Sequence, residues 1–256
     1  MLRKNKILFL LLFLILLAGC NNEKKQINSV YDLKYSNIGI YTGSEYDKLL
    51  EEKIENAIPA YYNSYSDEIS ALKSGKIDAF LTDEPLAQEI LRKNSGLKIL
   101  NEKLTNDSYA FAINSQKEEL KQKVDKIILE MKKDNILNEF KEKWFSDDEN
   151  IKNLEIYNYD YTNTIKFATV TGSAPFSYMK NNDIVGYDID VINYIGYKLK
   201  YKIEIIDMAF DGIIPAITSG KVDMAGCSII VTEERKKQVL FSEPNYYGGI
   251  VLVTRS

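Results

Sequence analysis

The chain has 256 residues, a formal net charge of −4 and no histidine. The missing histidine excludes Ser-His-Asp and Cys-His nucleophile systems and leaves little basis for zinc catalysis, so catalysis would depend on carboxylates, lysine or tyrosine. The acidic balance argues against nucleic acid and anionic lipid heads as partners. Composition therefore favours a binding protein over an enzyme.

The first twenty residues predict an export signal. Arg3, Lys4 and Lys6 give a positive start, and residues 7–18 form an apolar run that ends just before Cys20. This run is shorter than the roughly 20 residues that span a bilayer. Small residues before a cysteine are typical of a bacterial lipoprotein signal, in which Cys20 is acylated and becomes the new N-terminus. The alternative is an uncleaved anchor with an incidental cysteine. Both interpretations place the remaining chain outside the cytoplasmic membrane.

The predicted mature chain, residues 20–256, carries a net charge of −7 because the three basic residues of the signal are removed. Its length suits one or two units with proper cores. With Cys20 acylated, Cys227 is the only thiol left, so no disulfide is expected within the chain. Residues 21–29 are polar and predict a tether, and residues 146–163, acidic and then rich in Asn and Tyr, predict a second linker.

Strand and helix signals alternate between these segments. In the first part we predict strands at 37–41, 60–62, 77–81 and 109–113, and helices at 46–56, 67–73, 85–94 and within 117–144. In the second part we predict strands at 165–169, 202–206 and 222–225, and helices at 190–198 and 213–218. Such alternation favours an α/β fold with largely parallel sheets.

An internal repeat supports two related lobes. Residues 69–79 align with residues 214–224, and in each copy a helix is predicted to end at a glycine, Gly75 or Gly220. A lysine follows, then an aspartate, Asp78 or Asp223, and then a buried strand. Helix–glycine–strand connections are common, but a similarity over eleven aligned positions is harder to explain by chance.

The two halves together resemble the solute-binding proteins of polar-amino-acid ABC importers, often called family 3. The second half carries this likeness in segments 169–178, 185–190, 207–216, 228–235 and 241–246. The first half carries it in segments 32–33, 38–44, 71–79, 83–85 and 140–144. The resemblance implies a periplasmic binding protein type II-like fold: two α/β lobes with a hinge and an interlobe cleft.

The order of these segments differs from the family's usual order. Residues 30–105 are similar to lobe 2, residues 106–145 to the strand and helices that return to lobe 1, and residues 164–256 to the start of lobe 1. A circular permutation cut at the hinge explains this order, and it is physically easy when chain termini lie close together. The alternative is the remnant of a tandem protein.

The resemblance assigns the two charged groups of the site. Arg235 falls where the family binds a ligand carboxylate, and a planar guanidinium suits both carboxylate oxygens. It follows Thr232, a predicted helix N-cap. Without the resemblance, Arg235 would read as a surface arginine. Asp83 corresponds to the family's ligand for the ammonium group, although an aspartate before Glu84-Pro85 is also a natural helix cap.

Four further residues are expected at the cleft. Ser44 matches a residue that helps to hold the carboxylate, or belongs to an ordinary turn; Phe210 matches an aromatic that packs on the ligand side chain, or belongs to the core. The Ser228 carbonyl could accept from the ammonium. Ile230 departs from the pattern, because the family usually has a hydroxyl residue there.

Other nearby residues are expected to support the site or to weaken the assignment. Val170 and Ser173 replace polar and aromatic contacts that are common in the family. Phe176 is expected to support the pocket wall, while Asp188 and Asp190 are expected to be structural.

The sequence therefore predicts a monomeric, lipid-anchored receptor. It would close on a small zwitterionic ligand such as an amino acid and deliver it to ABC permease subunits, with no catalytic residue, metal, cofactor or nucleic acid and with membrane contact through the lipid anchor only. One alternative is an enzyme on the same scaffold, similar to a prephenate or arogenate (cyclohexadienyl) dehydratase. Another is a non-transporting ligand-sensing domain.

Overall fold

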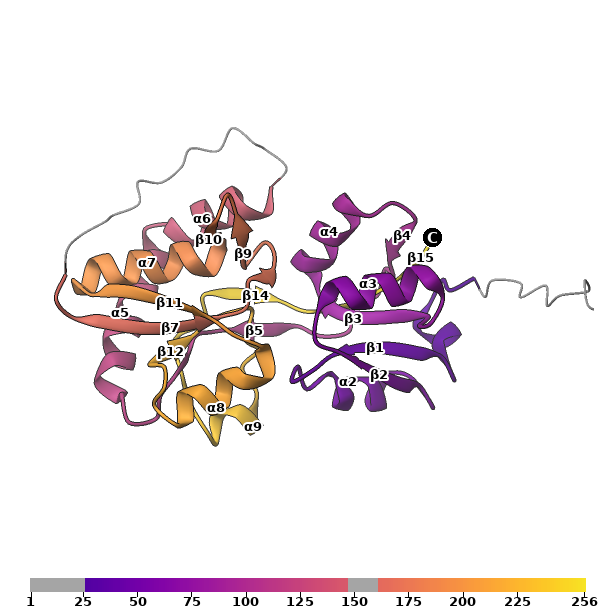
Figure 1. Ribbon diagram of the computed structural model, residues 1–256, viewed down its shortest axis with the longest axis horizontal. Helices are drawn as coiled ribbons and strands as arrows, with labels where there is room; N and C mark the ends of the chain where they lie inside the picture. The colour runs from indigo at the N-terminus through magenta and orange to yellow at the C-terminus, as the bar shows by residue number, and fades with distance from the viewer. Residues whose placement is uncertain (1–25, 147–160) are drawn as a thin grey trace, which may run out of the picture.

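A computed structural model describes residues 26–146 and 161–256 of the chain. They form two α/β bodies placed end to end along the long axis (Figure 1). We call residues 26–105 with 250–256 the first lobe, and residues 106–146 with 161–249 the second lobe. The predicted signal with Cys20, the start of the tether and most of the predicted linker 146–163 lie outside the described residues.

The first lobe is an α/β sandwich. Its elements are η1 (Val30–Leu33), β1 (Asn37–Tyr41), α2 (Tyr46–Lys53), β2 (Ile58–Tyr62), α3 (Tyr65–Ser74), β3 (Ala79–Asp83), α4 (Glu84–Lys93), β4 (Leu97–Ile99) and β15 (Ile250–Arg255). The strands lie in the order β2-β1-β3-β15-β4. β1 is parallel to β2 and β3, while β15 is antiparallel to β3 and β4. One face of this sheet packs on α2, and the other packs on α3 and α4.

The second lobe repeats this layered plan. Its elements are β5 (Asp107–Tyr109), β6 (Ala112–Ile113), α5 (Glu118–Lys133), α6 (Ile136–Phe145), β7 (Thr164–Thr169), β8 (Gly172–Ser173), β9 (Ser177–Lys180), β10 (Asp183–Val185), α7 (Tyr187–Leu199), β11 (Lys202–Asp207), η2 (Phe210–Gly212), α8 (Ile213–Thr218), β12 (Met224–Ala225), α9 (Glu233–Lys236), β13 (Leu240–Phe241) and β14 (Tyr246–Gly248). The main sheet has the order β11-β7-β12-β6-β13, with β7 parallel to β11 and β12.

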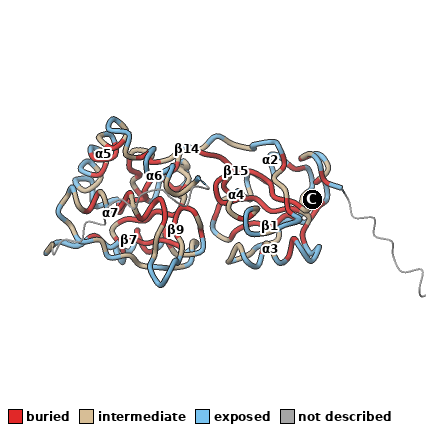
Figure 2. The backbone as a smooth tube through the Cα atoms, turned by 90° about the horizontal axis from the view of Figure 1, so that it is seen from above, coloured by how far each residue is buried: buried red, intermediate tan, exposed pale blue. Residues whose placement is uncertain are grey.

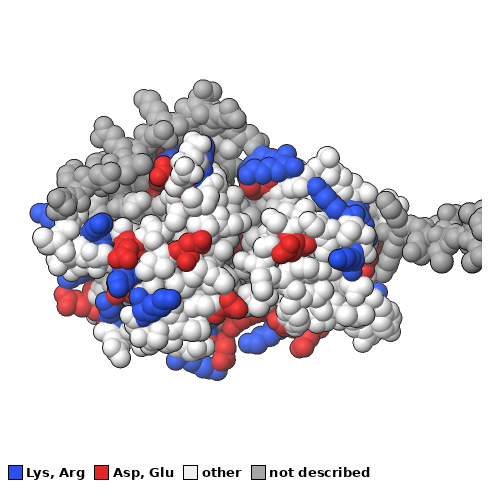
Figure 3. Space-filling view, in the orientation of Figure 1, with Lys and Arg blue, Asp and Glu red and all other residues white. Residues whose placement is uncertain are grey.

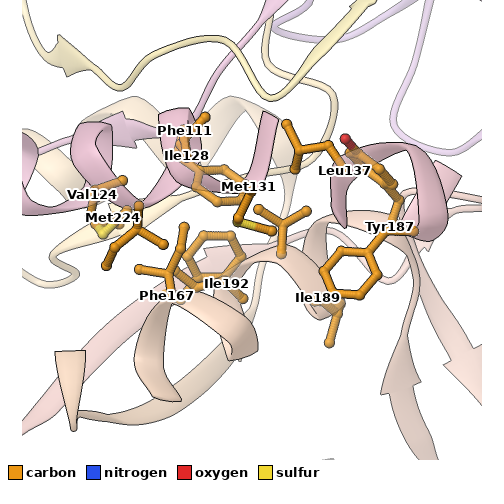
Figure 4. Packing of buried hydrophobic residues seen from close by; sticks show 14 of the residues in the cluster. Phe111, Val124, Ile128, Met131, Leu137, Phe167, Tyr187, Ile189, Ile192 and Met224 are labelled. Atoms are coloured by element: carbon orange, nitrogen blue, oxygen red, sulfur yellow. The ribbon is translucent and has the colours of Figure 1, made fainter. Parts of the chain in front are cut away.

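The apolar cores follow from this layering. Side chains of α5, including Ile128, and of α7, including Ile192, gather around Phe167 of β7 (Figure 4). On the opposite face of the sheet, α8 contributes Ile213 and Ile217 to a second cluster. The buried backbone therefore runs through the middle of each lobe, and exposed residues lie at its rim (Figure 2).

Two connections join the lobes within the described residues. One leads from β4 to β5 and the other from β14 to β15, and β5 and β14 pair antiparallel between the lobes. The sequence predicts 164–256 as one lobe-1-like unit, whereas residues 250–255 pair with β3 and β4 of the first lobe. The reason is burial: residues 250–254 are all enclosed between these two strands, a contact that local pattern does not show.

The predicted repeat has the same geometry in both lobes. Gly75 and Gly220 both take a positive φ, 80° and 75°, after the helix. Asp78 accepts a hydrogen bond from the Asn37 N–H (3.0 Å), and Asp223 accepts one from the Lys166 N–H (2.7 Å). In each copy the aspartate therefore ties the turn to the first residues of the neighbouring strand. This shared contact supports the interpretation of two related lobes.

Most predicted elements are present with somewhat shifted ends, and two predicted segments are each divided in the structure. The helix 213–218 has the predicted ends, and the Thr232 side chain caps α9 by accepting from the Arg235 N–H. The predicted helical stretch 117–144 is two helices, because Asn135 adopts the left-handed conformation (φ 65°) between them. The predicted strand 109–113 is also split, since β5 pairs with β14 between the lobes and β6 joins the second lobe's sheet.

Candidate functional site

A pocket lies between the lobes where the ends of their strands meet. Its lining comes from both lobes: Tyr41, Ser44, Tyr46, Tyr65, Asp83, Ser173, Phe210, Cys227, Ser228, Ile230 and Arg235. The side chains meet closely across this pocket and leave a cavity of only about 10 Å³ between its walls. All six ligand-binding residues expected from the sequence line this one pocket. It lies where ligands of open α/β sheets usually bind, outside the carboxyl ends of the strands.

Arg235 places a buried cation in this pocket. Its side chain belongs to the short helix α9, and the residue is only 4% exposed. Nη1 donates to the Ile230 carbonyl (3.0 Å) and Nη2 to the Gly43 carbonyl of the first lobe (3.1 Å). The guanidinium lies 5.6 Å from the centre of the Phe210 ring. Burial lowers the pKa of Arg235 from its ordinary value.

Within the described residues, no carboxylate forms an ion pair with Arg235. Removing a charged group from water is costly unless it is paired. Arg235 has two carbonyl acceptors, and the nearby carboxyl groups of Glu45 and Asp83 act on it only through space. The arrangement therefore favours an anion at this end of the pocket.

Asp83 supplies a buried carboxyl from the opposite lobe. It ends β3, precedes α4 and is 2% exposed. Asp83 is the N-cap residue of α4, as the alternative interpretation expected, but its side chain makes no cap hydrogen bond to the helix. Oδ1 instead accepts from the Tyr109 hydroxyl (2.7 Å), and Oδ2 accepts from the Ser228 hydroxyl (2.9 Å). Burial raises the pKa of Asp83 to about 6, although both hydroxyl donors oppose this rise.

Ser228 connects the two buried carboxyl groups at the cleft. It has a positive φ of 47°, which is unusual for a residue with a side chain. Its hydroxyl donates to Asp83, and its N–H donates to Asp188 Oδ2 (3.1 Å). Asp188 also accepts from Asn245 Nδ2 (3.1 Å), and burial raises the pKa of Asp188 to about 7. Asp188 thus holds the Ser228 backbone in an otherwise strained conformation.

Asp190 lies apart from this network. Its Oδ2 accepts from Lys143 Nζ (2.6 Å) and from the Trp144 indole N–H (2.7 Å), so it fixes α6 against α7. Phe176 is fully buried and stacks on Tyr109 with ring centres 6.1 Å apart. Val170 packs in the core of the second lobe. These residues support the site from behind.

Aromatic rings form the remaining wall. Tyr41 and Tyr65 of the first lobe stack with centres 4.5 Å apart, and Phe210 of the second lobe meets Tyr41 edge-on at 5.9 Å. Phe210 was expected here, whereas Tyr41, Tyr46 and Tyr65 were missed. Tyr41 could have been predicted from the sequence, because it lies at the carboxyl end of β1, just before the turn that contains Ser44.

Ser44 and Ile230 occupy the expected places with different contacts. Ser44 is 8% exposed, and its hydroxyl accepts weakly from the Tyr46 N–H (3.4 Å). Ile230 packs against the apolar core of the first lobe although it belongs to the second. Its carbonyl accepts from Arg235, as described above. Ile230 therefore provides an apolar contact between the lobes where the family usually has a hydroxyl.

Comparison with known sequences identifies the C-terminal part of the chain. Residues 165–256 match the sequence model of the bacterial extracellular solute-binding proteins, family 3. The likeness to that family covers this segment of the chain. The predicted recognition is thereby confirmed for the segment that holds Phe210, Ser228, Ile230 and Arg235.

Proteins named for amino-acid binding are among the relatives. A probable histidine-binding protein of Campylobacter jejuni is 36% identical over 85 residues, which cover 33% of each chain. The arginine-binding extracellular protein ArtP of Bacillus subtilis is 37% identical over 81 residues, or 32% of each chain. A solved ancestral arginine-binding protein bound to arginine is 45% identical over 32% of this chain and 37% of its own, with a TM-score of 0.32. The chain thus matches only about a third of the length of these relatives.

Two other kinds of feature are absent from the part of the chain that the structure describes. No helix there is long and apolar enough to cross a membrane. No group of three or more His, Cys, Asp or Glu side chains there is arranged to hold a metal ion.

Proposed function

We propose that this protein is an extracytoplasmic solute-binding lipoprotein of an ABC importer that binds an amino acid between its lobes and delivers it to permease subunits. The observation that carries the proposal is that one pocket holds both a buried guanidinium, Arg235, which has no ion-pair partner among the described residues, and a buried carboxyl from the other lobe, Asp83. A zwitterion is the small molecule whose two charges complement these groups. The amino acids named for the family 3 relatives agree with this ligand class.

The carboxylate end of the ligand would bind Arg235. The guanidinium now donates to the Gly43 and Ile230 carbonyls, and a bidentate carboxylate offers it stronger, charge-assisted acceptors. The Ser44 hydroxyl, which makes only one weak contact, lies in the same lining and can donate to this carboxylate. The side chain of the ligand would lie against Phe210, Tyr41 and Tyr65.

The ammonium end would bind Asp83. Its carboxylate oxygens already accept from Tyr109 and Ser228, and each oxygen has a second lone pair for an ammonium donor. The Ser228 carbonyl is a further candidate acceptor. Both charges of the ligand are then satisfied only when the two lobes are closed on it. Binding would therefore shift the population toward closure by hinge motion at β5 and β14.

The anchor and the chain order complete this proposal. An acylated Cys20 would hold the receptor at the outer face of the cytoplasmic membrane, beside a permease. We attribute the rotated order of segments to circular permutation. Supporting contacts lie at the two ends of the described chain: the Ser256 N–H donates to the Gly96 carbonyl, and Lys98 Nζ donates to Asn28. Both ends thus lie beside residues 96–98, which brings the termini close together.

An enzyme on the same scaffold is the second candidate, favoured by one observation. Asp83 lines the pocket with a pKa raised to about 6, a value suited to a general acid or base near neutral pH. The family 3 relatives are named as binding proteins, which supports the first candidate. Incubation with prephenate or arogenate separates the two, because conversion of either compound would establish catalysis.

The deciding experiment is thermal unfolding of residues 21–256 with each of the twenty amino acids. A bound ligand at a hundredfold excess over its dissociation constant should stabilise the protein by about 2.7 kcal/mol. Arg235→Ala should lower the affinity roughly 30-fold or more, since it leaves the ligand carboxylate unpaired in the cleft. Arg92→Ala, at an exposed arginine of the first lobe, is the matched control and should bind like wild type. A cooperative transition that no amino acid shifts would contradict the proposal.

A further inference from the structure

The topology of the first lobe gathers its helix-to-strand turns at the end that faces away from the second lobe. We call this surface the outer end; it consists of residues 26–37, 53–58, 73–79, 96–98 and 255–256. Hydrogen bonds link these segments: the Ile58 N–H donates to the Ser36 carbonyl, the Asn37 N–H to Asp78, and Lys98 Nζ to Asn28. The C-terminus lies at this end (Figure 1).

The outer end is basic although the whole chain is acidic. It carries six basic side chains, Lys34, Lys53, Lys73, Lys76, Lys98 and Arg255, against three acidic ones, Asp32, Glu55 and Asp78. Lys34 pairs with Glu55 (2.8 Å), and Arg255 pairs with Asp78 (3.3 Å). The Asp32 carboxylate accepts from the backbone N–H groups of residues 28 and 29.

Four lysines of the outer end remain without a carboxylate partner among the described residues: Lys53, Lys73, Lys76 and Lys98. Figure 3 shows Lys and Arg side chains gathered on this side of the first lobe. The charge of this surface is therefore opposite in sign to that of the protein as a whole.

Large apolar side chains are exposed on the same surface. Tyr31 is 87% exposed, Tyr35 65% and Ile58 52%. Tyr35 and Ile58 are adjacent, since the Tyr35 N–H donates to Glu55 and the Ile58 N–H donates to Ser36. Lys34 Nζ lies 5.2 Å from the centre of the Tyr35 ring. Tyrosine beside lysine is the combination that membrane-interface surfaces use, because both have an apolar body and a polar tip.

The chain between Cys20 and the outer end is short, which limits how far this surface can lie from a lipid attached to Cys20. Five residues lie between Cys20 and Gln26, so the six Cα-to-Cα steps between them span at most about 22 Å. Ile27 is already buried in the first lobe. An acyl group on Cys20 would therefore keep the outer end next to the lipid head groups.

We propose that the outer end of the first lobe docks on the anionic lipid surface of the membrane, with Tyr31 and Tyr35 at the head-group level and Lys53, Lys73, Lys76 and Lys98 facing the lipid charges. This inference rests on the Cys20 anchor of the proposed function but needs no ligand in the cleft. Docking would fix the orientation of the receptor, with the cleft held away from the lipid by the depth of the first lobe. The net charge of the chain does not show this surface, because the acidic residues lie elsewhere.

Tryptophan quenching by brominated lipid tests the docking. The anchor is supplied chemically, by coupling residues 20–256 through Cys20 to a maleimide phospholipid; Cys227 is 1% exposed and is shielded from the reagent. Tyr31→Trp reports on the outer end, and Leu129→Trp on α5 of the second lobe, at a side chain 51% exposed, is the matched control. Trp144, the only native tryptophan, gives the same background in both.

In vesicles with 30% phosphatidylglycerol we expect quenching at residue 31 to exceed that at residue 129 by about threefold or more. Lys53→Glu with Lys76→Glu should remove this excess, whereas Lys202→Glu with Lys221→Glu, at exposed lysines of the second lobe, should preserve it. Equal quenching at residues 31 and 129 would overturn the proposal, as would an excess that survives reversal of the outer-end lysines. A dimer in sedimentation that Tyr31→Ser dissolves would instead make this surface a self-interface.

Failure of the docking and failure of the proposed function are distinguishable. Docking is read from tryptophan quenching without amino acid, and ligand binding is read from thermal unfolding without vesicles. Either result can be positive while the other is negative.

Discussion

Glu68 of α3 is buried, and neither of its carboxylate oxygens has a hydrogen-bond partner in the described part of the chain. It lies beneath β1, where its Oε1 is 3.2 Å from the position that a Cβ on Gly39 would take. Burial alone raises the pKa of Glu68 well above its usual value of 4.5. An unpartnered carboxyl at this depth is expected to keep its proton in the folded protein.

Glu68→Gln should therefore change how stability depends on pH. Because the folded pKa is raised, the contribution of Glu68 to stability is greatest below pH 4.5 and falls as the unfolded chain ionises above this pH, by at most about 1.4 kcal/mol per pH unit. The glutamine variant lacks this loss. In urea unfolding at pH 4.5, 6 and 8, the free energy of unfolding of the variant should rise relative to that of the wild type as the pH rises. A constant difference across this range would mean that Glu68 titrates normally.

Asp83 should make ligand affinity depend on pH in the opposite direction, so that affinity falls as the pH is lowered. Its pKa of about 6 means that it is protonated below this pH and then has no charge to attract an ammonium. If Asp83 binds the ammonium, affinity should fall about tenfold for each pH unit below 6 and be constant above 7. Calorimetric titration at pH 5 and pH 8 checks this. Asp83→Asn should bind weakly at both values, and a wild-type affinity independent of pH would exclude Asp83 from the ammonium site.

At the scale of elements, one glycine decides how α7 meets the small β8–β9–β10 sheet. Gly186 precedes α7 with a φ of 138°, and a Cβ there would lie 2.3 Å from the Phe176 carbonyl oxygen. Both the backbone conformation and the close approach exclude other residues. The same turn places Asp188 under Ser228, so the element also supports the site.

Gly186→Ala should thus destabilise the protein by about 2–4 kcal/mol, because the backbone must move to relieve both the contact and the strain. Gly172→Ala is the matched control, since nothing lies within 4 Å of the position that its Cβ would take and its φ is not positive. Denaturant midpoints of the two variants measure the difference. Equal midpoints would show that the turn at residue 186 relaxes without cost.

At the scale of the whole molecule, the rotated order of segments predicts that the chain still folds when its segments are put back into the family order. If the chain is a circular permutant, the family order can be restored by starting at residue 161, joining Ser256 to Gln26 with about five Gly/Ser residues, and ending at residue 146. The ends are near each other beside residues 96–98, so this join should cost little. We expect cooperative unfolding within about 2 kcal/mol of the original chain and the same ligand preference. A rearranged chain that does not unfold cooperatively would favour the tandem-remnant explanation.

Several features were predictable because they depend on residues near each other in sequence. Gly75 and Gly220 mark the ends of two helices, and Thr232 marks the start of α9, because turns and caps have local chemical requirements. The expected positions of Arg235, Asp83, Ser44, Phe210, Ser228 and Ile230 came from ordered motifs. The structure brings all six to one pocket; their roles in binding remain proposals.

The sequence by itself determined the alternation of strands and helices, the two related lobes and the residue types of the site, since each follows from local pattern or motif. Only the tertiary structure decided that β15 crosses to the first lobe, that Tyr41 and Tyr65 face Phe210, and that the Asp83 side chain accepts from Tyr109 and not from the first turn of α4. It also decided where the charges lie: an acidic chain has a basic outer end. These features depend on which distant segments become neighbours, and neighbours in space are set by packing of the whole sheet and not by the order of residues along it.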